Sequence, residues 1–97
     1  MRVDELKELL SRGEKPVVLD VREHVELASE PYPFEVLHIP MGELPHRVSE
    51  LPRNVPIVCA CRSGARSAQV TLWLRRRGLE AVNLEGGLLA WSRRFPG

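Results

Sequence analysis

The chain has 97 residues, 43% hydrophobic and 28% charged, which are ordinary fractions for a globular protein and exclude a disordered or collagen-like chain. The length suits one domain over residues 1–97, and no apolar run approaches the roughly 20 residues that cross a bilayer. The net charge of +1 gives no basis for a nucleic-acid surface. We therefore expect no membrane or nucleic-acid partner and, without an apolar signal segment at the start, a cytoplasmic location.

The charges are unevenly distributed along the chain. Residues 1–60 hold seven basic and eleven acidic residues, a balance of −4, whereas residues 61–97 hold seven arginines and two acids, a balance of +5. The sign therefore changes at Cys61. Three consecutive arginines, 75–77, are typical of a solvated helix face. Two others, Arg62 and Arg66, follow the cysteine closely.

The first half of the chain predicts helices and strands in alternation. Leucines spaced three and four residues apart predict a helix that is capped by Asp4 and ends at Gly13. The β-branched run 17–21 is apolar on both faces, which is typical of a parallel strand covered on both sides. The next predicted elements are short helical turns over 23–28, a strand over 36–39 and a helix over 42–51.

The second half continues the alternation. The apolar run 56–60 predicts a second buried strand, which ends at Cys61. The remaining predicted elements are a helix over 66–77, a strand over 81–84 and a helix over 88–94. Strands that alternate with helices at this spacing indicate an α/β domain with a mainly parallel sheet. Such sheets place their sites beyond the carboxyl ends of the strands, where Cys61 stands.

The two cysteines are expected to have different roles. We expect Cys59 and Cys61 to point to opposite faces of their strand, so that a disulfide between them would be strained. Two cysteines are too few for a structural zinc site, and we expect neither a metal nor a cofactor. Cys59, inside the apolar strand, is predicted to be a buried and inert thiol.

The segment 61–67, Cys-Arg-Ser-Gly-Ala-Arg-Ser, carries the strongest chemical signal. A cysteine between the end of a strand and the start of a helix lies over backbone amides, at the positive end of the helix dipole. With Arg62 and Arg66 in the same turn, these surroundings lower the pKa of the thiol. The same groups can hold a second anion beside the sulfur. Cys61 is therefore the predicted nucleophile, and it requires no histidine base.

Three further segments accompany this loop in a fixed order. They read Leu-Asp-Val-Arg over 19–22, Leu-Pro and Pro-Ile-Val within 51–58, and Leu-Glu-Gly-Gly-Leu-Leu-Ala-Trp over 84–91. Together with 61–67 they resemble the motifs of the rhodanese-like sulfurtransferases. The resemblance implies a small three-layer α/β fold, with a mainly parallel five-stranded sheet and helices on both faces.

The resemblance also implies an activity. Cys61 would take sulfane sulfur from thiosulfate or a persulfide donor, hold it as a persulfide, and pass it to cyanide or to a small or protein thiol. The substrate-binding positions would be Arg62, Ser63, Gly64, Ala65 and Arg66. The supporting positions would be Asp20, Arg22 and Ser67. The arginines would bind sulfonate oxygens, and the amides of residues 63–65 would stabilise the persulfide.

Two other functions stay open. Cysteine phosphatases and arsenate reductases place an arginine six positions after the cysteine, where this chain has Ser67; Arg66 stands at five, and the shorter loop suits a lone sulfur better than a phosphoryl group. Rhodanese-like domains also serve as non-catalytic binding modules, which commonly lack the cysteine that is present here.

The chain departs from the family pattern before the third strand. Family members usually carry Gly-His-Ile-Pro-Gly-Ala, whereas residues 30–36 read Glu-Pro-Tyr-Pro-Phe-Glu-Val. We therefore expect a rebuilt wall beside the site. His38 is expected to be a strand or wall residue and not a catalytic base.

Overall fold

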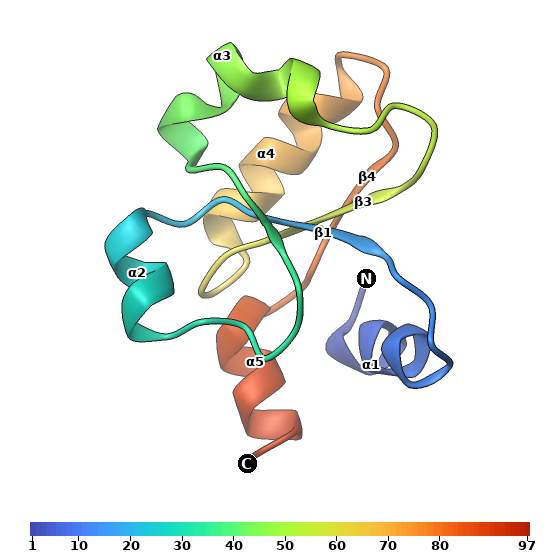
Figure 1. The fold of residues 1–97 in the computed structure, drawn as a ribbon, viewed down its shortest axis with the longest axis vertical. Coiled ribbons are helices and arrows are strands. Elements are labelled where there is room, and N and C mark those ends of the chain that lie inside the picture. Colours follow the sequence, from blue (N-terminus) through green and yellow to red (C-terminus); the bar gives the residue numbers. More distant parts are fainter.

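The computed structural model describes residues 1–97 as a parallel sheet between two layers of helices (Figure 1). The strands, in the order β2-β1-β3-β4, are β1 (Val17–Asp20), β2 (Leu37–His38), β3 (Ile57–Ala60) and β4 (Ala81–Asn83). The α-helices are α1 (Val3–Ser11), α2 (His24–Ser29), α3 (Leu44–Arg47), α4 (Ala65–Arg75) and α5 (Gly87–Arg94). Two 3₁₀ turns, η1 (Met41–Glu43) and η2 (Val48–Glu50), flank α3. None of the helices has the length and apolar character needed to cross a membrane.

The sheet has four strands, so the five-stranded sheet that the resemblance implied is corrected. Met1 alone lies beside β4: its amino group donates to the Asn83 carbonyl at 2.8 Å, and its own carbonyl accepts from the Glu85 amide at 2.9 Å. Helix α1 begins at Val3, two residues later. One paired residue at this edge is too short to form a strand.

The bounds of the predicted helices shift by one or two residues at their ends, and two helix predictions need a larger correction. The predicted helix over 42–51 is divided into η1, α3 and η2, because Pro45 lacks an amide proton and fits only the first turn of an α-helix, where α3 places it. The predicted cap Asp4 is wrong as well: Arg2 is the N-cap of α1, and Asp4 lies in its first turn.

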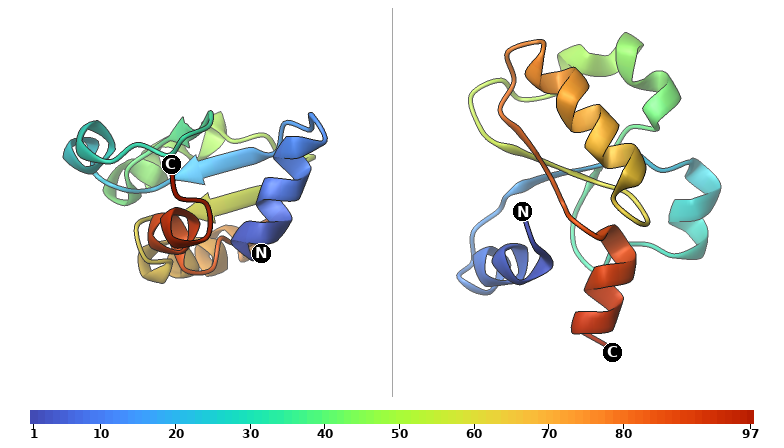
Figure 2. Two further views of the ribbon diagram at one scale, coloured as in Figure 1. Left: turned by 90° about the horizontal axis from the view of Figure 1, so that it is seen from below. Right: turned by 180° about the vertical axis from the view of Figure 1, so that it is seen from behind.

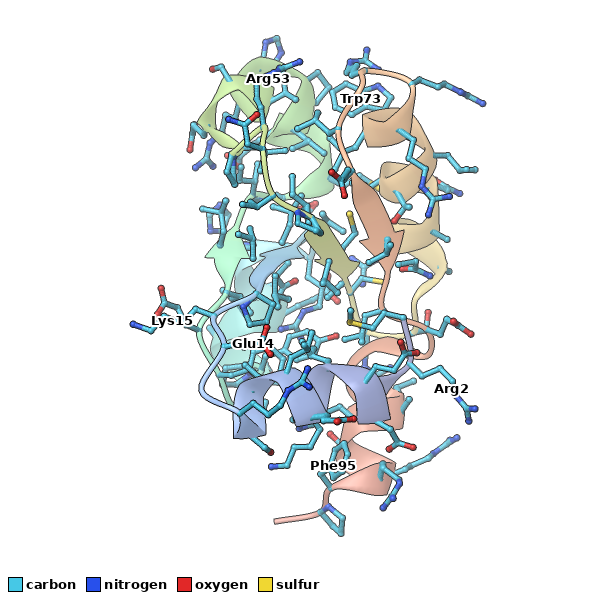
Figure 3. The ribbon with its side chains drawn as sticks, turned by 90° about the vertical axis from the view of Figure 1, so that its right-hand side faces the viewer. Arg2, Glu14, Lys15, Arg53, Trp73 and Phe95 are labelled. Carbon is cyan, nitrogen blue, oxygen red and sulfur yellow. The ribbon has the colours of Figure 1, made fainter.

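The sheet separates two apolar clusters. One side is covered by α3 and α4 and the other by α1 and α5 (Figures 1 and 2). The cluster under α3 and α4 includes Leu44, Leu51, Val70 and Leu74 with Leu19 and Ile57. The cluster under α1 and α5 includes Val3, Leu6, Leu84, Leu88 and Trp91 with Val18 and Val58. Phe95, at the end of α5 (Figure 3), extends it with a ring centroid 4.8 Å from that of Trp91.

The two cysteines lie in the same apolar cluster, and the expectation that they face opposite sides is wrong. Side chains two residues apart on a strand point to the same face, and the chain keeps this direction as it leaves β3 at Ala60. Both thiols are free and buried. Burial raises the pKa of Cys59, which favours its neutral thiol form.

A buried ion pair joins Asp20 at the end of β1 to Arg22 just beyond it. The side chains are 0% and 1% exposed, and the Arg22 Nη2 donates to the Asp20 Oδ2 at 2.8 Å. The Arg22 Nη1 donates to the Glu30 carbonyl at 2.7 Å. The pair therefore fixes the chain where it leaves α2.

Replacing Asp20 by asparagine is expected to destabilise the protein by about 3–5 kcal/mol, because it leaves a buried guanidinium without its carboxylate. The free energy of unfolding in urea measures the effect. The control is Glu50→Gln, which removes a carboxylate from an exposed pair with Arg47 and is expected to leave the unfolding midpoint nearly unchanged. Equal midpoints for the two variants would contradict a structural role for the buried pair.

Candidate active site

The cysteine loop connects the end of β3 to the start of α4. Gly64, the N-cap of α4, has φ +95°, a left-handed conformation that side chains rarely adopt, and a Cβ there would lie 3.0 Å from the Gly86 nitrogen. The resulting tight turn directs the Gly64 amide to the Cys61 Sγ at 3.1 Å. The Ser67 Oγ, in the first turn of α4, lies 3.3 Å from the same sulfur.

These hydrogen bonds affect the pKa of the Cys61 thiol. Burial of the sulfur acts to raise the pKa of Cys61, and hydrogen bonds from the Ser67 hydroxyl and from loop amides act to lower it. The hydrogen bonds prevail, so the pKa lies below its usual value. The amides of Ser63, Gly64 and Ser67 contribute to this lowering, and that of Gly64 lies within hydrogen-bond distance of the sulfur. The amide of Ala65, which we expect to stabilise a persulfide, contacts the Ser63 Oγ at 3.4 Å.

Asn83, at the end of β4, orients the loop, and sequence reasoning missed it. Its Nδ2 donates to the Gly64 carbonyl at 3.1 Å, and its Oδ1 accepts from the Ser67 hydroxyl at 2.6 Å. Ser67 has one hydroxyl proton, which serves either Asn83 or the Cys61 sulfur at any moment. A thiolate is the stronger acceptor, so the hydroxyl can turn to the sulfur when Cys61 ionises.

The start of α5 holds the backbone of the loop from the other side. The amides of Leu88 and Leu89 donate to the carbonyls of Cys61 and Arg62, at 3.1 and 3.0 Å. Gly87 has φ +55°, and a Cβ there would lie 2.6 Å from both carbonyl oxygens. The double glycine of the 84–91 segment therefore lets α5 approach the loop closely enough to bond it.

Tyr32, in the segment that departs from the family pattern, forms part of the wall beside the loop. Its hydroxyl donates to the Cys61 carbonyl at 2.6 Å, and its side chain is buried. The Arg22 guanidinium lies 5.1 Å from the centre of its ring. Sequence reasoning identified the altered segment but not this residue. A lone tyrosine among prolines was the available signal, since a buried tyrosine usually finds a partner for its hydroxyl.

Both loop arginines are paired with glutamates near α2, which lies beside the loop in Figures 1 and 2. The Arg66 Nη1 and Nη2 donate to the Glu26 Oε1 and Oε2 at 2.6 and 2.8 Å. The Arg62 Nε lies 3.5 Å from the Glu30 Oε1. Bonds from Arg66 lower the pKa of Glu26 to about 2, so Glu26 is ionised at neutral pH. The sequence predicted the arginines but not their carboxylate partners.

His24 and His38 contact groups other than the Cys61 sulfur. The His38 Nε2 lies 2.7 Å from the Arg22 carbonyl, and the His24 Nε2 lies 3.3 Å from the Glu43 Oε2. No three side chains of the types that ligate metals gather anywhere in the chain. The groups that the structure places around the Cys61 sulfur are its hydrogen-bond donors, with two paired arginines on the same loop and helix.

Replacing Ser67 by alanine is expected to slow alkylation of Cys61 by iodoacetamide at pH 7 by about 10-fold or more, because a hydrogen bond to a charged group contributes about 1.5–3 kcal/mol. Only the thiolate reacts, so the rise of the rate with pH should move to higher pH. The control Ser63→Ala keeps its backbone amide and should leave the dependence of the alkylation rate on pH unchanged. An unchanged profile for Ser67→Ala would contradict the role of the hydroxyl.

Comparison with known proteins places this geometry in a family. Residues 2–94 match the model of the rhodanese-like domain. The chain is 40% identical over 87 residues to "Putative sulfurtransferase YtwF" of Bacillus subtilis, covering 90% of this chain and 84% of that protein. It is 38% identical to a protein named "Sulfurtransferase" from Allochromatium vinosum, covering 93% of this chain and 84% of that one.

A solved structure agrees with these matches. The crystal structure of a rhodanese-like domain protein from Staphylococcus aureus superimposes with a TM-score of 0.87 at 35% identity, covering 94% of this chain and 88% of that one. The family model spans nearly the whole chain and includes Asp20, Arg22 and the entire cysteine loop. The chain therefore belongs to the rhodanese-like family.

Proposed function

We propose that the protein transfers sulfane sulfur from thiosulfate or a persulfide donor to cyanide or a thiol, through a persulfide on Cys61. Its relatives named as sulfurtransferases support sulfur transfer in general. The observation that carries the finer proposal is the Cys61 sulfur itself, which accepts hydrogen bonds from the Gly64 amide and the Ser67 hydroxyl and has a lowered pKa. We place the reaction in the cytoplasm.

In the first half-reaction the Cys61 thiolate attacks the outer sulfur of the donor. With thiosulfate, a new S–S bond forms to Cys61 while the donor's S–S bond breaks, and its electron pair leaves with sulfite. The total charge is −3 before and after the step, and no external oxidant is needed. The product is a Cys61 persulfide anion.

The loop then holds the transferred sulfur. The persulfide anion has its charge on the outer sulfur, beyond the position that the Cys61 Sγ now occupies. Backbone amides at the start of α4 can turn to that charge, as they do to the thiolate, and the helix dipole has the favourable sign. In the second half-reaction, cyanide or a thiolate attacks the outer sulfur, and Cys61 leaves as the thiolate.

The arginines are proposed to bind the oxygens of the donor. Arg66 lies in the first turn of α4 and Arg62 next to Cys61, so both side chains start from the cysteine loop and the helix that follows it. Guanidinium groups bind sulfonate-like oxygens through paired N–H donors. Glu26 and Glu30 contact these guanidinium groups in the structure.

The phosphatase alternative has less support. A phosphoryl group needs donors around three oxygens, which an arginine six positions after the cysteine would supply. Ser67 occupies that position and directs its hydroxyl to the sulfur and to Asn83. The loop is therefore arranged around one sulfur atom. The lowered pKa of Cys61 argues against a non-catalytic binding module, because binding alone does not require an ionisable thiol.

Incubation with thiosulfate is expected to add one sulfur to the protein, a gain of roughly 32 Da in intact mass. Cyanide should remove the added mass. Cys61→Ser should show no gain, whereas Cys59→Ala should keep it, because Cys59 lies inside β3 and its pKa is raised while that of Cys61 is lowered. Tests with thiosulfate and with a thiol persulfide cover both donor classes. A folded protein that gains no mass from either donor would contradict sulfur transfer through Cys61.

Replacing Arg66 by alanine is expected to lower kcat/KM for thiosulfate by about 10-fold or more, because one charge-assisted contact is worth about 1.5–3 kcal/mol. Arg76, at the opposite end of α4, provides the control: Arg76→Ala should leave the rate near that of the unaltered protein. Steady-state thiocyanate formation measures both variants. Equal rates for the two would show that Arg66 does not bind the donor.

A further inference from the structure

Helix α2 has an unusual attachment to the protein. None of its six residues is buried, and Val25 is 73% exposed. Its side chains instead make polar contacts to the active-site side of the molecule: Glu26 to Arg66, and His24 to Glu43. The helix therefore contributes little to the apolar core. Its clearest effect is on the charges beside Cys61.

Glu26 makes the tightest of these contacts. Its two carboxylate oxygens accept from the two terminal nitrogens of Arg66, at 2.6 and 2.8 Å. This is the fork-to-fork geometry in which a guanidinium would also bind a sulfonate. A donor that needs Arg66 must therefore displace Glu26 or share the guanidinium with it.

The pairing changes the charge that a donor meets. Arg62 and Arg66 alone would outweigh the charge of the Cys61 thiolate and leave a local balance of +1. With the side chains of Glu26 and Glu30 beside them, the formal charge balance of these five groups is −1. Repulsion grows with the charge of the incoming molecule. Thiosulfate carries two negative charges, whereas a persulfide on a thiol, R–S–S⁻, carries one at its reacting end.

We propose that Glu26 is a specificity-determining residue, which turns the site away from dianionic sulfur donors and toward singly charged persulfide donors. This inference rests on the proposed sulfur transfer through Cys61. The persulfide step balances as before: Cys61 gains the outer sulfur, the donor's S–S bond breaks, and the electron pair leaves on the donor thiolate. No other oxidant or reductant takes part.

Glu30 is a weaker candidate for the same role. Its contact with Arg62 is a single approach of 3.5 Å between side chains that are 57% and 53% exposed. The Glu26 and Arg66 side chains are 27% and 38% exposed. Water screens an exposed pair more than a partly covered one. The influence on the donor is therefore concentrated at Glu26.

The test compares Glu26→Gln with the unaltered protein on two donors, each of which loses its outer sulfur by cleavage of an S–S bond. Thiosulfate is a dianion, and methanethiosulfonate, CH₃SO₂S⁻, is a monoanion with the same kind of S–S bond. Removing one negative charge should raise kcat/KM by about 10-fold for thiosulfate and by about 3-fold for methanethiosulfonate, since the electrostatic energy scales with donor charge. Glutamine keeps the oxygen that accepts from the Glu23 amide, so the start of α2 is preserved.

Two further variants complete the design. Glu26→Asp keeps the charge, so its ratio of the two kcat/KM values should stay near that of the unaltered protein. Glu50→Gln removes a carboxylate from a similar bidentate pair with Arg47, outside the site, and should also leave the ratio in place. High salt should reduce the advantage of Glu26→Gln, because screening weakens the repulsion.

The possible results separate this inference from the proposed function. If Glu26→Gln raises kcat/KM for both donors equally, or for neither, Glu26 does not select by charge and the inference is overturned, while sulfur transfer stands. If no donor gives a mass gain on Cys61 in the unaltered protein, the proposed function itself fails. A shift of the ratio in Glu26→Gln alone, with unchanged unfolding midpoints in urea, supports the inference.

Discussion

The site depends on one residue, Cys61, being held from two sides at once. Its sulfur accepts hydrogen bonds from Gly64 and Ser67, and its carbonyl accepts from the Tyr32 hydroxyl and the Leu88 amide. Gly64 and Ser67 follow Cys61 closely, whereas Tyr32 and Leu88 belong to segments that are far from it in the sequence. Because the backbone of Cys61 cannot move without breaking these hydrogen bonds, the sulfur stays under the amides of the loop. Such preorganisation means that little reorganisation is needed when charge develops there.

The thiolate and the arginines are separate electrostatic elements. We expected Arg62 and Arg66 to favour the thiolate by their charge, but glutamates neutralise both in the resting protein. The hydrogen bonds to the sulfur come from uncharged groups, which salt screens little because the sulfur is buried. The hydrogen bonds therefore lower the pKa of Cys61 whether or not the arginines are engaged.

Much of the architecture follows from local patterns. Apolar runs predicted β1 and β3 to within one residue, and the strand-turn-helix motif located Cys61, because both depend on neighbouring residues. Pairings across the sheet were not predictable in this way. Glu26 is 40 residues from Arg66, and Tyr32 is 29 from Cys61. The fifth strand was assigned from resemblance alone, and one paired residue at Met1 replaces it.

The hydrogen bonds to the Cys61 sulfur and the glutamates that pair with the arginines lie on different segments, so one can change without the other. A substitution on α2 alters the charge that a donor meets without touching the hydrogen bonds that ionise Cys61. Because α2 buries no residue, its side chains are also free of packing constraints. The loop, in contrast, is fixed by Gly64 and Gly87, where a Cβ would meet backbone atoms. The part of the chain that lowers the pKa of Cys61 thus tolerates little change, whereas the part that we propose to select the donor tolerates more.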